Sequence, residues 1–371
     1  MIEFVAPLWN NVVPFLIVLT VLVFVHELGH YALARWAGVR VEVFSIGFGP
    51  ELFGWTDKSD TRWKISAVPL GGYVKMFGEG DFEDDSDVPR LLSEAEKQVS
   101  FRHKPLLKRA LIVFAGPAAN FIFAIVVLAA LFSTLGQPYS PAEVGTVVPD
   151  SAAAAAGFKP GDRFLRIEDK TIERFEDVQH IIRLNPGSPI TIIVDRADAE
   201  VALIATPEIK EITDRAGNKH RIGRLGVTRQ GVEFKQRNPA SAVWYATRET
   251  WSLITGTLEA VGQMITGARE AKELGGPIKI AQMSGEVWEI GVVALISFMA
   301  LLSVNLGLIN LFPVPMLDGG HLMFFMFEAI RGRPLAEKAQ EYSLRIGLAL
   351  VLSLMVFVTI NDIVNLSYWN S

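Results

Sequence analysis

Cysteine is absent from all 371 residues of the chain, and this absence excludes both disulfide bonds and thiolate ligands to a metal. Charged residues are scarce, at 20%, whereas half of the residues are hydrophobic and the mean hydropathy is +0.31. That balance is typical of a membrane protein. A basic excess is also missing, because the formal net charge is −5, so nucleic-acid binding is excluded as a function.

Four stretches of the chain are apolar enough to cross a bilayer, namely residues 12–34, 110–135, 290–312 and 346–364. No Lys or Arg precedes Arg35, so the first stretch lacks the basic start of a secretory signal and is expected to be retained. Basic residues gather instead in residues 35–109 and 331–345. The positive-inside rule therefore predicts that both of these segments are cytoplasmic and that both termini lie on the far side.

The first apolar stretch contains an unusual polar motif, His26-Glu27-Leu28-Gly29-His30. A spacing of four residues puts the two imidazoles on one face of a helix, where both can bind one zinc ion, with Glu27 beside them as a general base. Ionisable groups inside a membrane span are costly and usually functional. We therefore interpret this motif as a metal site rather than as ordinary helix surface.

A catalytic zinc commonly takes three protein ligands, so a third ligand must come from elsewhere in the chain. The third apolar stretch ends at two prolines and then reads Asp318-Gly319-Gly320. Irregular backbone at membrane depth is tolerated only where it is buried in protein or lines a watery cavity, and the predicted topology puts Asp318 at the cytoplasmic depth of His30. We predict Asp318 as the third ligand. Two alternatives remain open, a helix N-cap role for Asp318 and His321 as a rival ligand.

Other polar groups are weaker candidates for a metal site. His103, His180 and His220 lie in hydrophilic stretches and are expected to be solvated. The acidic run within residues 79–87 is expected to form a solvated loop rather than a cation site.

Between the second and third apolar stretches lies a polar region that the topology sends outside. Its pattern predicts strands at residues 144–148, 164–167 and 190–194, and helices at 152–156 and 175–184. The region resembles a PDZ domain, and the matching residues are Pro149-Asp150-Ser151-Ala152-Ala153, Ala156-Gly157 and Gly161-Asp162-Arg163-Phe164-Leu165. The resemblance implies peptide binding at a sheet edge, while a spacer without a ligand is the alternative.

A helical pattern follows in residues 239–268, where Trp244, Trp251, Leu258 and Ile265 recur every seven positions. Such an amphipathic helix suits the outer membrane surface, although packing against the protein core explains the pattern equally well. The sequence Gly275-Gly276-Pro277 is expected to break any helix before the third apolar stretch.

Taken together, the motifs resemble those of the site-2 protease family of intramembrane zinc metalloproteases, and most closely its bacterial RseP-type branch, here with a single PDZ domain. The resemblance covers nearly the whole chain and rests on motifs in order along the apolar stretches: residues 26–30, Gly116-Pro117-Ala118-Ala119-Asn120-Phe121, residues 275–278 and Asn310 through Gly319.

The resemblance assigns roles to these residues. It implies that His26, His30 and Asp318 bind one Zn²⁺ and that Glu27 moves protons during peptide hydrolysis. Asn310 and Asn120 are candidates for holding the substrate backbone or an oxyanion, but a helix-end role for Asn310 and a helix contact through Gly116 remain open.

Further substrate contacts are expected from predicted strands on the cytoplasmic side and from the prolines after the third apolar stretch. Residues 41–50 and 63–74 read as strands and resemble the family's membrane-associated β-sheet, whose open edge could pair with an unwound substrate. We hypothesise that Gly71, Gly72 and Tyr73 lie beside the extended substrate. Pro313 and Pro315, in the third-span motif, are also predicted substrate contacts.

The predicted fold class is a mainly α membrane protein with four transmembrane helices, a small membrane-associated β-sheet and an inserted α/β PDZ domain. The expected domains are 1–38, the first transmembrane helix with HExxH; 39–105, the cytoplasmic sheet and loop; 106–136, the second transmembrane helix; 140–232, the periplasmic PDZ domain; 237–289, the interfacial helix and linker; 290–325, the third transmembrane helix with the Leu-Asp-Gly motif; and 326–371, a cytoplasmic loop and the fourth transmembrane helix.

The predicted function is hydrolysis of peptide bonds in or near transmembrane segments of single-pass membrane proteins, such as anti-sigma factors already cleaved outside. The expected location is a bacterial inner membrane, with both termini periplasmic and the active site toward the cytoplasm. The expected partners are these substrates, a peptide at the PDZ domain and the bilayer. The rival functions are a non-catalytic PDZ scaffold with a structural zinc site and a metal carrier. Glu27 disfavours the scaffold because a structural site needs no general base, and the lack of further polar sites along the spans disfavours the carrier.

Overall fold

The computed structural model describes residues 2–79, 92–172, 174–213, 219–229, 231, 233–267 and 275–369. The chain divides into two compact units. The first unit contains Met1–Leu128, Tyr245–Thr257 and Lys272–Ser371, and the second contains Ala129–Trp244 and Leu258–Ala271.

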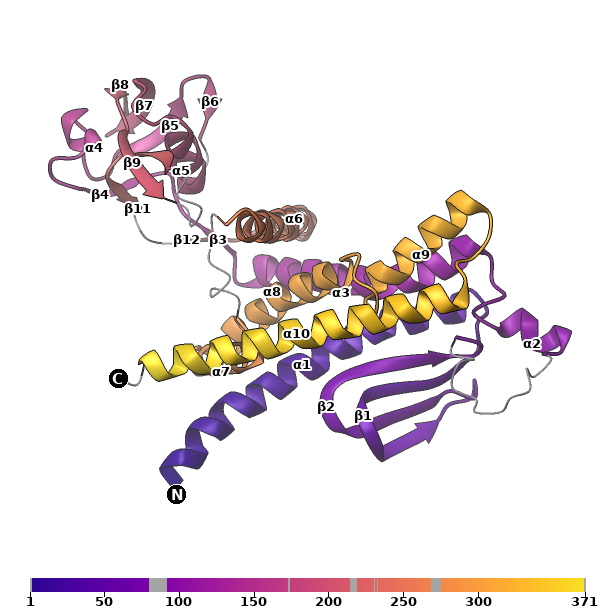
Figure 1. Cartoon of the computed structure of the whole chain (residues 1–371). Coiled ribbons are helices and arrows are strands. Elements are labelled where there is room, and N and C mark those ends of the chain that lie inside the picture. The colour runs from indigo at the N-terminus through magenta and orange to yellow at the C-terminus, as the bar shows by residue number, and fades with distance from the viewer. Residues whose placement is uncertain are drawn as a thin grey trace. The chain divides into compact units, whose positions relative to one another are not determined.

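Long helices dominate the first unit (Figure 1). They are α1 (Ile2–Trp36), α3 (Leu106–Thr134), α8 (Val292–Asn310) and α10 (Glu337–Trp369), accompanied by the shorter α2 (Glu94–Val99), α7 (Pro277–Ile290) and α9 (Asp318–Arg331). Each long helix contains a segment apolar enough to span a membrane, namely Trp9–Trp36, Leu106–Thr134, Val292–Asn310 and Lys338–Val364. The prediction of a mainly helical chain with four helices that are long and apolar enough to cross a membrane is therefore confirmed.

Two apolar clusters hold the first unit together. Val18 and Leu22 of α1 pack with Leu295 of α8 and Phe123 of α3. A second cluster joins the end of α1 to the sheet, α3 and α9, and its buried members are Ala34, Ala37, Val39, Val41, Met76, Phe101, Ile112 and Val113. Because apolar burial stabilises by about 25 cal/mol per Å², these clusters fix the relative positions of the helices that carry the candidate site.

A small antiparallel sheet lies against α1 and is formed by two long, bent strands, β1 (Val41–Thr56) and β2 (Arg62–Met76) (Figure 1). Both strands bend so sharply that the first part of β1 lies between two parts of β2. Val43, for example, pairs with both Lys75 and Arg62. Gly47 and Gly49 have φ values of +88° and +86°, which favour glycine and allow β1 to bend. Across the sheet the four segments therefore follow the order 72–76, 41–46, 62–66, 51–56. Segment 72–76 lies at one edge of the sheet, since among the described residues it pairs with β1 on one side and with no strand on the other.

Helix α7 was not predicted, since residues 237–289 were expected to form one interfacial helix and a linker. It begins directly after Gly276 and ends at Gly291, whose φ of +130° separates it from α8. Its first N–H groups are satisfied from another helix, because Asp362 on α10 accepts hydrogen bonds from the backbone N–H of Gly276, Ile278 and Lys279 at 2.9, 3.1 and 3.0 Å. This carboxylate replaces the local cap that the Gly-Gly-Pro sequence lacks.

The stretch expected at residues 290–325 contains two helices. Helix α8 ends at Asn310 and α9 begins at Asp318, because Pro313 and Pro315 cannot donate the N–H groups that a continuous helix needs. Between them Met316 has a φ of +88°, an uncommon conformation for a residue with a side chain. This turn directs the chain into α9 with Asp318 as its first residue.

The second unit contains most of the short strands. A four-stranded antiparallel sheet has the order β6 (Lys170–Thr171), β5 (Arg163–Ile167), β7 (Ile190–Arg196), β8 (Ala199–Ala205). Among the described residues the unit also contains three separate two-stranded sheets: β3 (Gln137–Tyr139) with β12 (Glu233–Lys235), β4 (Val144–Val147) with β11 (Val227–Arg229), and β9 (Glu208–Thr213) with β10 (Lys219–Arg224).

Helices α4 (Ala152–Ala155) and α5 (Phe175–Leu184) contribute to the apolar core of this unit, in which Phe164, Ile167, Ile192 and Val194 are fully buried. The predicted strands near residues 144, 164 and 190 and the helices near 152 and 175 are present. Helix α6 (Pro239–Ile265) follows the predicted amphipathic pattern, with Trp244, Trp251, Leu258 and Ile265 all exposed.

Candidate metal centre

His26 and His30 lie one turn apart on α1 and both are buried. Their Nε2 atoms are 3.2 Å apart. Close contact with α3 is possible because the neighbouring residues are small: a Cβ at Gly29 would overlap the Ala115 carbonyl, and a Cβ at Gly116 would overlap His30 Nε2. The glycines of the two motifs therefore bring α3 directly against the two imidazoles.

Asp318 brings a carboxylate to the same point from α9. Its Oδ2 lies 3.2 Å from His26 Nε2 and its Oδ1 lies 3.5 Å from His30 Nε2. The N-cap alternative does not apply, because the N-cap residue is Leu317 and Asp318 is the first residue of the helix. Gly319 and Gly320 allow this approach, since a Cβ on either would overlap backbone of the turn before α9.

The arrangement of these atoms fits a bound cation. His30 Nδ1 is 2.9 Å from the Ile112 carbonyl, which accepts the Nδ1 proton and leaves the Nε2 lone pair free. Asp318 Oδ2 is buried and, among the described residues, accepts no hydrogen bond despite its closeness to His26. Ligand atoms of the three residues lie within 4.8 Å of one another. Two imidazoles and one carboxylate form a ligand set that suits zinc.

His321 is not part of this group of ligand atoms, which contains only His26, His30 and Asp318 among the described residues. The His321 ring packs against Phe324 instead, with ring centroids 6.2 Å apart.

Glu27 is half-buried beside the two histidines and also contacts the sheet. A Cβ at Gly72 would lie 3.2 Å from Glu27 Cγ and 2.7 Å from the Ser45 carbonyl oxygen. Segment 72–76, with its open edge, therefore lies directly beside the candidate general base. The neighbouring Tyr73 ring stacks on Phe48 at a centroid distance of 6.2 Å.

Asn310, in the last turn of α8, also reaches the site. Its Nδ2 is 3.4 Å from His26 Nε2, so its amide lies beside the ligand atoms. The two prolines that follow differ from each other. Pro313 is exposed, whereas Pro315 packs within the protein, because a Cβ at Gly347 would overlap its carbonyl. Pro315 is half-buried, like Asn310, so a substrate contact at either proline stays a prediction.

Asn120 was expected to contact substrate, but it is fully buried and faces a metal-site histidine instead. Its Nδ2 is 3.1 Å from His26 Nδ1. Sequence reasoning missed this contact and also missed the Ile112 carbonyl behind His30, because both partners lie on a different helix at large sequence separation. Only the Gly116 motif indicated a close contact at this part of α3.

Two of the other histidines, His103 and His180, are not part of the ligand group. His103 Nδ1 is 3.1 Å from Ser100 Oγ, and His180 is exposed. The side chain of His220 and the acidic residues from Asp81 to Asp87 lie outside the described part of the structure.

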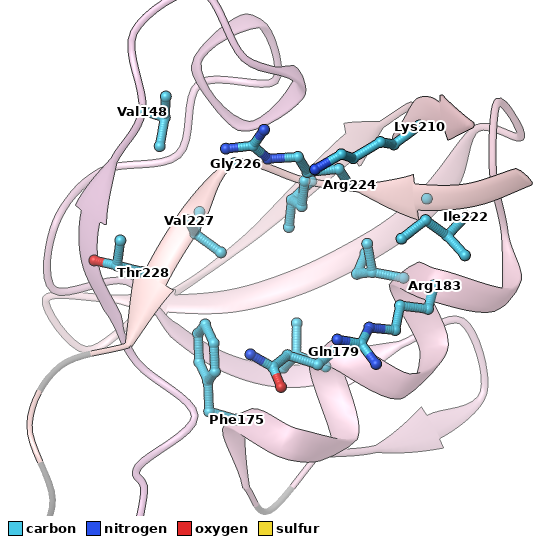
Figure 2. Close-up of a pocket in the computed structure, with 14 residues that line it drawn as sticks. Val148, Phe175, Gln179, Arg183, Lys210, Ile222, Arg224, Gly226, Val227 and Thr228 are labelled. Atoms are coloured by element: carbon cyan, nitrogen blue, oxygen red, sulfur yellow. The ribbon is translucent and has the colours of Figure 1, made fainter. Parts of the chain in front are cut away.

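The second unit contains a groove of about 290 Å³ between α5 and the strands β10 and β11 (Figure 2). Its floor is apolar and includes the buried Phe175, Val178, Ile182 and Leu225. Its rim carries three exposed cationic side chains, which are Arg183, Lys210 and Arg224. An extended, anionic peptide is the kind of ligand that such a groove can accept.

Comparison with known proteins agrees with the ligand set of this site, because the family and the relatives that match the chain are named as peptidases or metalloproteases. The Peptidase family M50 model matches residues 14–354. A relative from Agrobacterium fabrum, named as a candidate zinc metalloprotease, is 48% identical over 365 residues, which cover 97% of each chain. Metalloprotease MmpA of Caulobacter vibrioides is 37% identical over 376 residues, covering 95% of this chain and 94% of that protein.

A solved structure, the PDZ domain of an SdrC-like protein from Listeria monocytogenes, aligns with 24% of this chain and 88% of its own, at 18% identity and a TM-score of 0.18. That likeness is too weak to assign a fold. The family match extends over most of the chain and the relatives cover nearly all of it. The chain belongs to peptidase family M50, the site-2 protease family.

Proposed function

We propose that this membrane metalloprotease hydrolyses peptide bonds in or near the transmembrane segments of single-pass membrane proteins. One observation carries the proposal: His26, His30 and Asp318 converge within 4.8 Å inside a bundle of apolar helices, with Glu27 beside them. Ionisable groups at such depth are expensive to bury and are kept where they have a function.

His26 and His30 would hold one zinc ion through Nε2, and Asp318 would hold it through its carboxylate. When bound, zinc supplies a Lewis acid that polarises the scissile carbonyl and lowers the pKa of water at the site toward neutrality. The buried setting strengthens these electrostatic effects because little water is present to screen them.

Glu27 handles the protons of the reaction. Its carboxylate takes a proton from the attacking water and delivers it to the nitrogen of the departing peptide. Half-burial beside the ligands places Glu27 where both transfers can occur. Asn310 points its amide at the same space and would donate a hydrogen bond to the carbonyl oxygen as negative charge develops there.

The open edge of segment 72–76 would hold the substrate. A transmembrane helix has its backbone groups paired internally, so the scissile bond becomes accessible only after local unwinding. The edge at Gly71, Gly72 and Tyr73 can replace the lost hydrogen bonds by pairing with an extended peptide. Its contact with Glu27 supports this role.

The second unit would act on the same substrates from outside. Residues 140–232 would form a PDZ domain whose groove between α5 and β11 binds an extended peptide. The apolar floor and the cations of the rim support peptide binding. The protein would reside in a bacterial inner membrane, with periplasmic termini and a cytoplasm-facing site, and its substrates would include anti-sigma factors trimmed outside.

The variant Glu27→Gln tests the proposal in the full chain. It removes the base without removing a zinc ligand, so zinc content should stay at the wild-type level while cleavage of a single-pass membrane substrate falls about 100-fold or more. The matched control is Glu259→Gln, at an exposed position on α6, which should cleave normally. Cleavage at the wild-type rate by Glu27→Gln would refute the assignment of Glu27 as the base, whereas a wild-type chain that binds zinc but cleaves no membrane substrate would favour the scaffold.

A further inference from the structure

The buried amide of Asn120 controls what the metal-site histidine His26 can do. It faces Nδ1 of that ring at 3.1 Å, while Nε2 lies in the ligand group 3.2 Å from Asp318 Oδ2. A neutral histidine carries one ring proton, on Nδ1 or on Nε2. The group that faces Nδ1 therefore decides whether Nε2 has a lone pair for a metal.

An Asn amide can face the ring in two ways. With its nitrogen toward Nδ1, the amide donates a hydrogen bond to Nδ1, and the ring proton must then be on Nε2. In that state Nε2 has no free lone pair with which to bind a metal. With its oxygen toward Nδ1, the amide accepts the Nδ1 proton and the Nε2 lone pair is free. A half turn about the last side-chain bond exchanges the two orientations.

Ser303 on α8 distinguishes these orientations. Its buried hydroxyl lies 2.9 Å from the Asn120 backbone carbonyl and 3.4 Å from Asn120 Oδ1. A hydroxyl has only one proton to donate, so it cannot serve both oxygens. After the half turn, the hydroxyl donates to the backbone carbonyl and accepts from the amide nitrogen. Each buried polar group then has a partner, and buried groups strongly favour that outcome.

We propose that Ser303 and Asn120 form a hydrogen-bonded chain that fixes His26 with its proton on Nδ1 and its Nε2 free for zinc. Asn120 is thus a positioning residue rather than a substrate contact. His30 has the simpler counterpart, since the Ile112 carbonyl behind its Nδ1 can only accept. This inference rests on the proposed role of His26 as a zinc ligand.

The test measures zinc affinity of the full chain by competition with a chelator, and records the visible spectrum of the Co²⁺-substituted protein. Asn120→Leu should weaken zinc binding about 10- to 100-fold and change the Co²⁺ spectrum. Asn120→Asp should bind zinc at least as tightly as the wild type, because a carboxylate can only accept from Nδ1. A purely structural role would not produce that ranking, since burying an ionised carboxylate costs desolvation free energy that leucine does not.

Ser303→Ala gives a second readout through a double-mutant cycle. Alone it should weaken zinc binding, because the amide loses the group that selects its orientation. Combined with Asn120→Asp it should have little effect, since a carboxylate presents oxygen either way round. The matched control is Asn305→Leu, on the same helix α8. This change removes a half-buried amide whose oxygen accepts a hydrogen bond from Thr257 Oγ1 at 3.0 Å, and it should leave zinc affinity unchanged.

Two results would overturn the inference: wild-type zinc affinity in Asn120→Leu, or equal losses in Asn120→Leu and Asn120→Asp. Failure of the proposed function looks different. If His26 is not a zinc ligand, the wild-type chain itself binds no zinc at His26 and His30, and if the zinc is only structural, the ranking of zinc affinities holds while the wild-type chain cleaves no substrate.

Discussion

At the scale of single residues, Gly116 determines how closely α3 approaches the metal-site histidines. A Cβ at this position would overlap His30 Nε2, the atom that we propose as a ligand. Gly116→Ala should therefore displace the ring. Overpacking of this kind costs about 1–3 kcal/mol, which corresponds to roughly 5- to 150-fold in zinc affinity. Equilibrium dialysis of the full chain against zinc measures the loss.

Gly256→Ala is the matched control for this prediction. Gly256 lies within α6, and a Cβ there would meet nothing within 4 Å, so the same substitution should leave zinc affinity unchanged. Equal zinc affinity in the two variants would show that the contact between Gly116 and His30 does not position the ring.

The site residues divide by how local their signals are. His26 and His30 could be predicted from spacing alone, and Asp318 from a helix break at membrane depth. Asn120 could not be assigned correctly, because its role depends on His26, 94 residues away, and on Ser303, 183 residues away. A sequence motif shows that a polar group is buried, but it does not show which group that residue faces.

At the scale of secondary-structure elements, the open edge of the sheet is the part closest to Glu27. Tyr73→Pro removes one backbone N–H from segment 72–76 and distorts its open edge. Cleavage of a membrane substrate should fall about 10-fold, the size of one lost hydrogen bond, while zinc content stays at the wild-type level. Both are measured on the same purified sample.

Leu52→Pro provides the comparison, because segment 51–56 lies at the opposite edge of the same sheet. That variant should cleave nearly as well as the wild type. If the two variants lose activity equally, the sheet contributes through its general stability and not through an edge that holds substrate.

In the second unit, the ion pair between Asp162 and Arg196 connects the residue just before β5 to the last residue of β7. Arg196 Nε and Nη2 each donate to Asp162 at 2.7 Å, and the Lys159 N–H donates at 2.8 Å. Burial alone would raise the pKa of Asp162, but these donors lower it below its ordinary value. The stabilisation is therefore complete above the unfolded pKa of about 3.9 and is lost as the pH falls through the lower, folded pKa.

Asp162→Asn should reduce the free energy of unfolding of the second unit by about 1–3 kcal/mol at neutral pH. It should also make that free energy fall less steeply as the pH is lowered. Hydrogen exchange of the β5 and β7 amides in the full chain, corrected for intrinsic rates between pH 3 and 7, measures both effects. An unchanged acid profile in the variant would mean that other carboxylates control the acid sensitivity of this unit.

The elements themselves could be predicted unequally. The four long helices follow from apolar runs that leave no alternative in a bilayer, and the strands near residues 144, 164 and 190 follow from local turn signals. Helix α7 could not be predicted, since its N-terminus is capped by Asp362 from α10 rather than by a neighbour in sequence. The sheet order could not be predicted either, because β1 pairs with two parts of β2.

At the scale of the whole molecule, one chain combines a bundle of apolar helices that contains the candidate metal centre with a polar unit that contains a groove. The groove carries three cations and, among its lining residues within the described structure, no acidic side chain. Carboxylates on a peptide would therefore strengthen its binding there. The two sites serve one function if the groove selects or restrains the protein that the membrane site cleaves.

The central claim is that His26, His30 and Asp318 hold one zinc ion inside the membrane-spanning bundle. Zinc X-ray absorption spectroscopy on the purified full chain, beside Asp318→Asn, tests it most directly. We predict one zinc per chain with two imidazole nitrogens and carboxylate oxygen at about 2.0–2.2 Å, and a loss of zinc in the variant. A purified wild-type chain that binds no zinc, or whose zinc lacks the two imidazoles, would contradict the account.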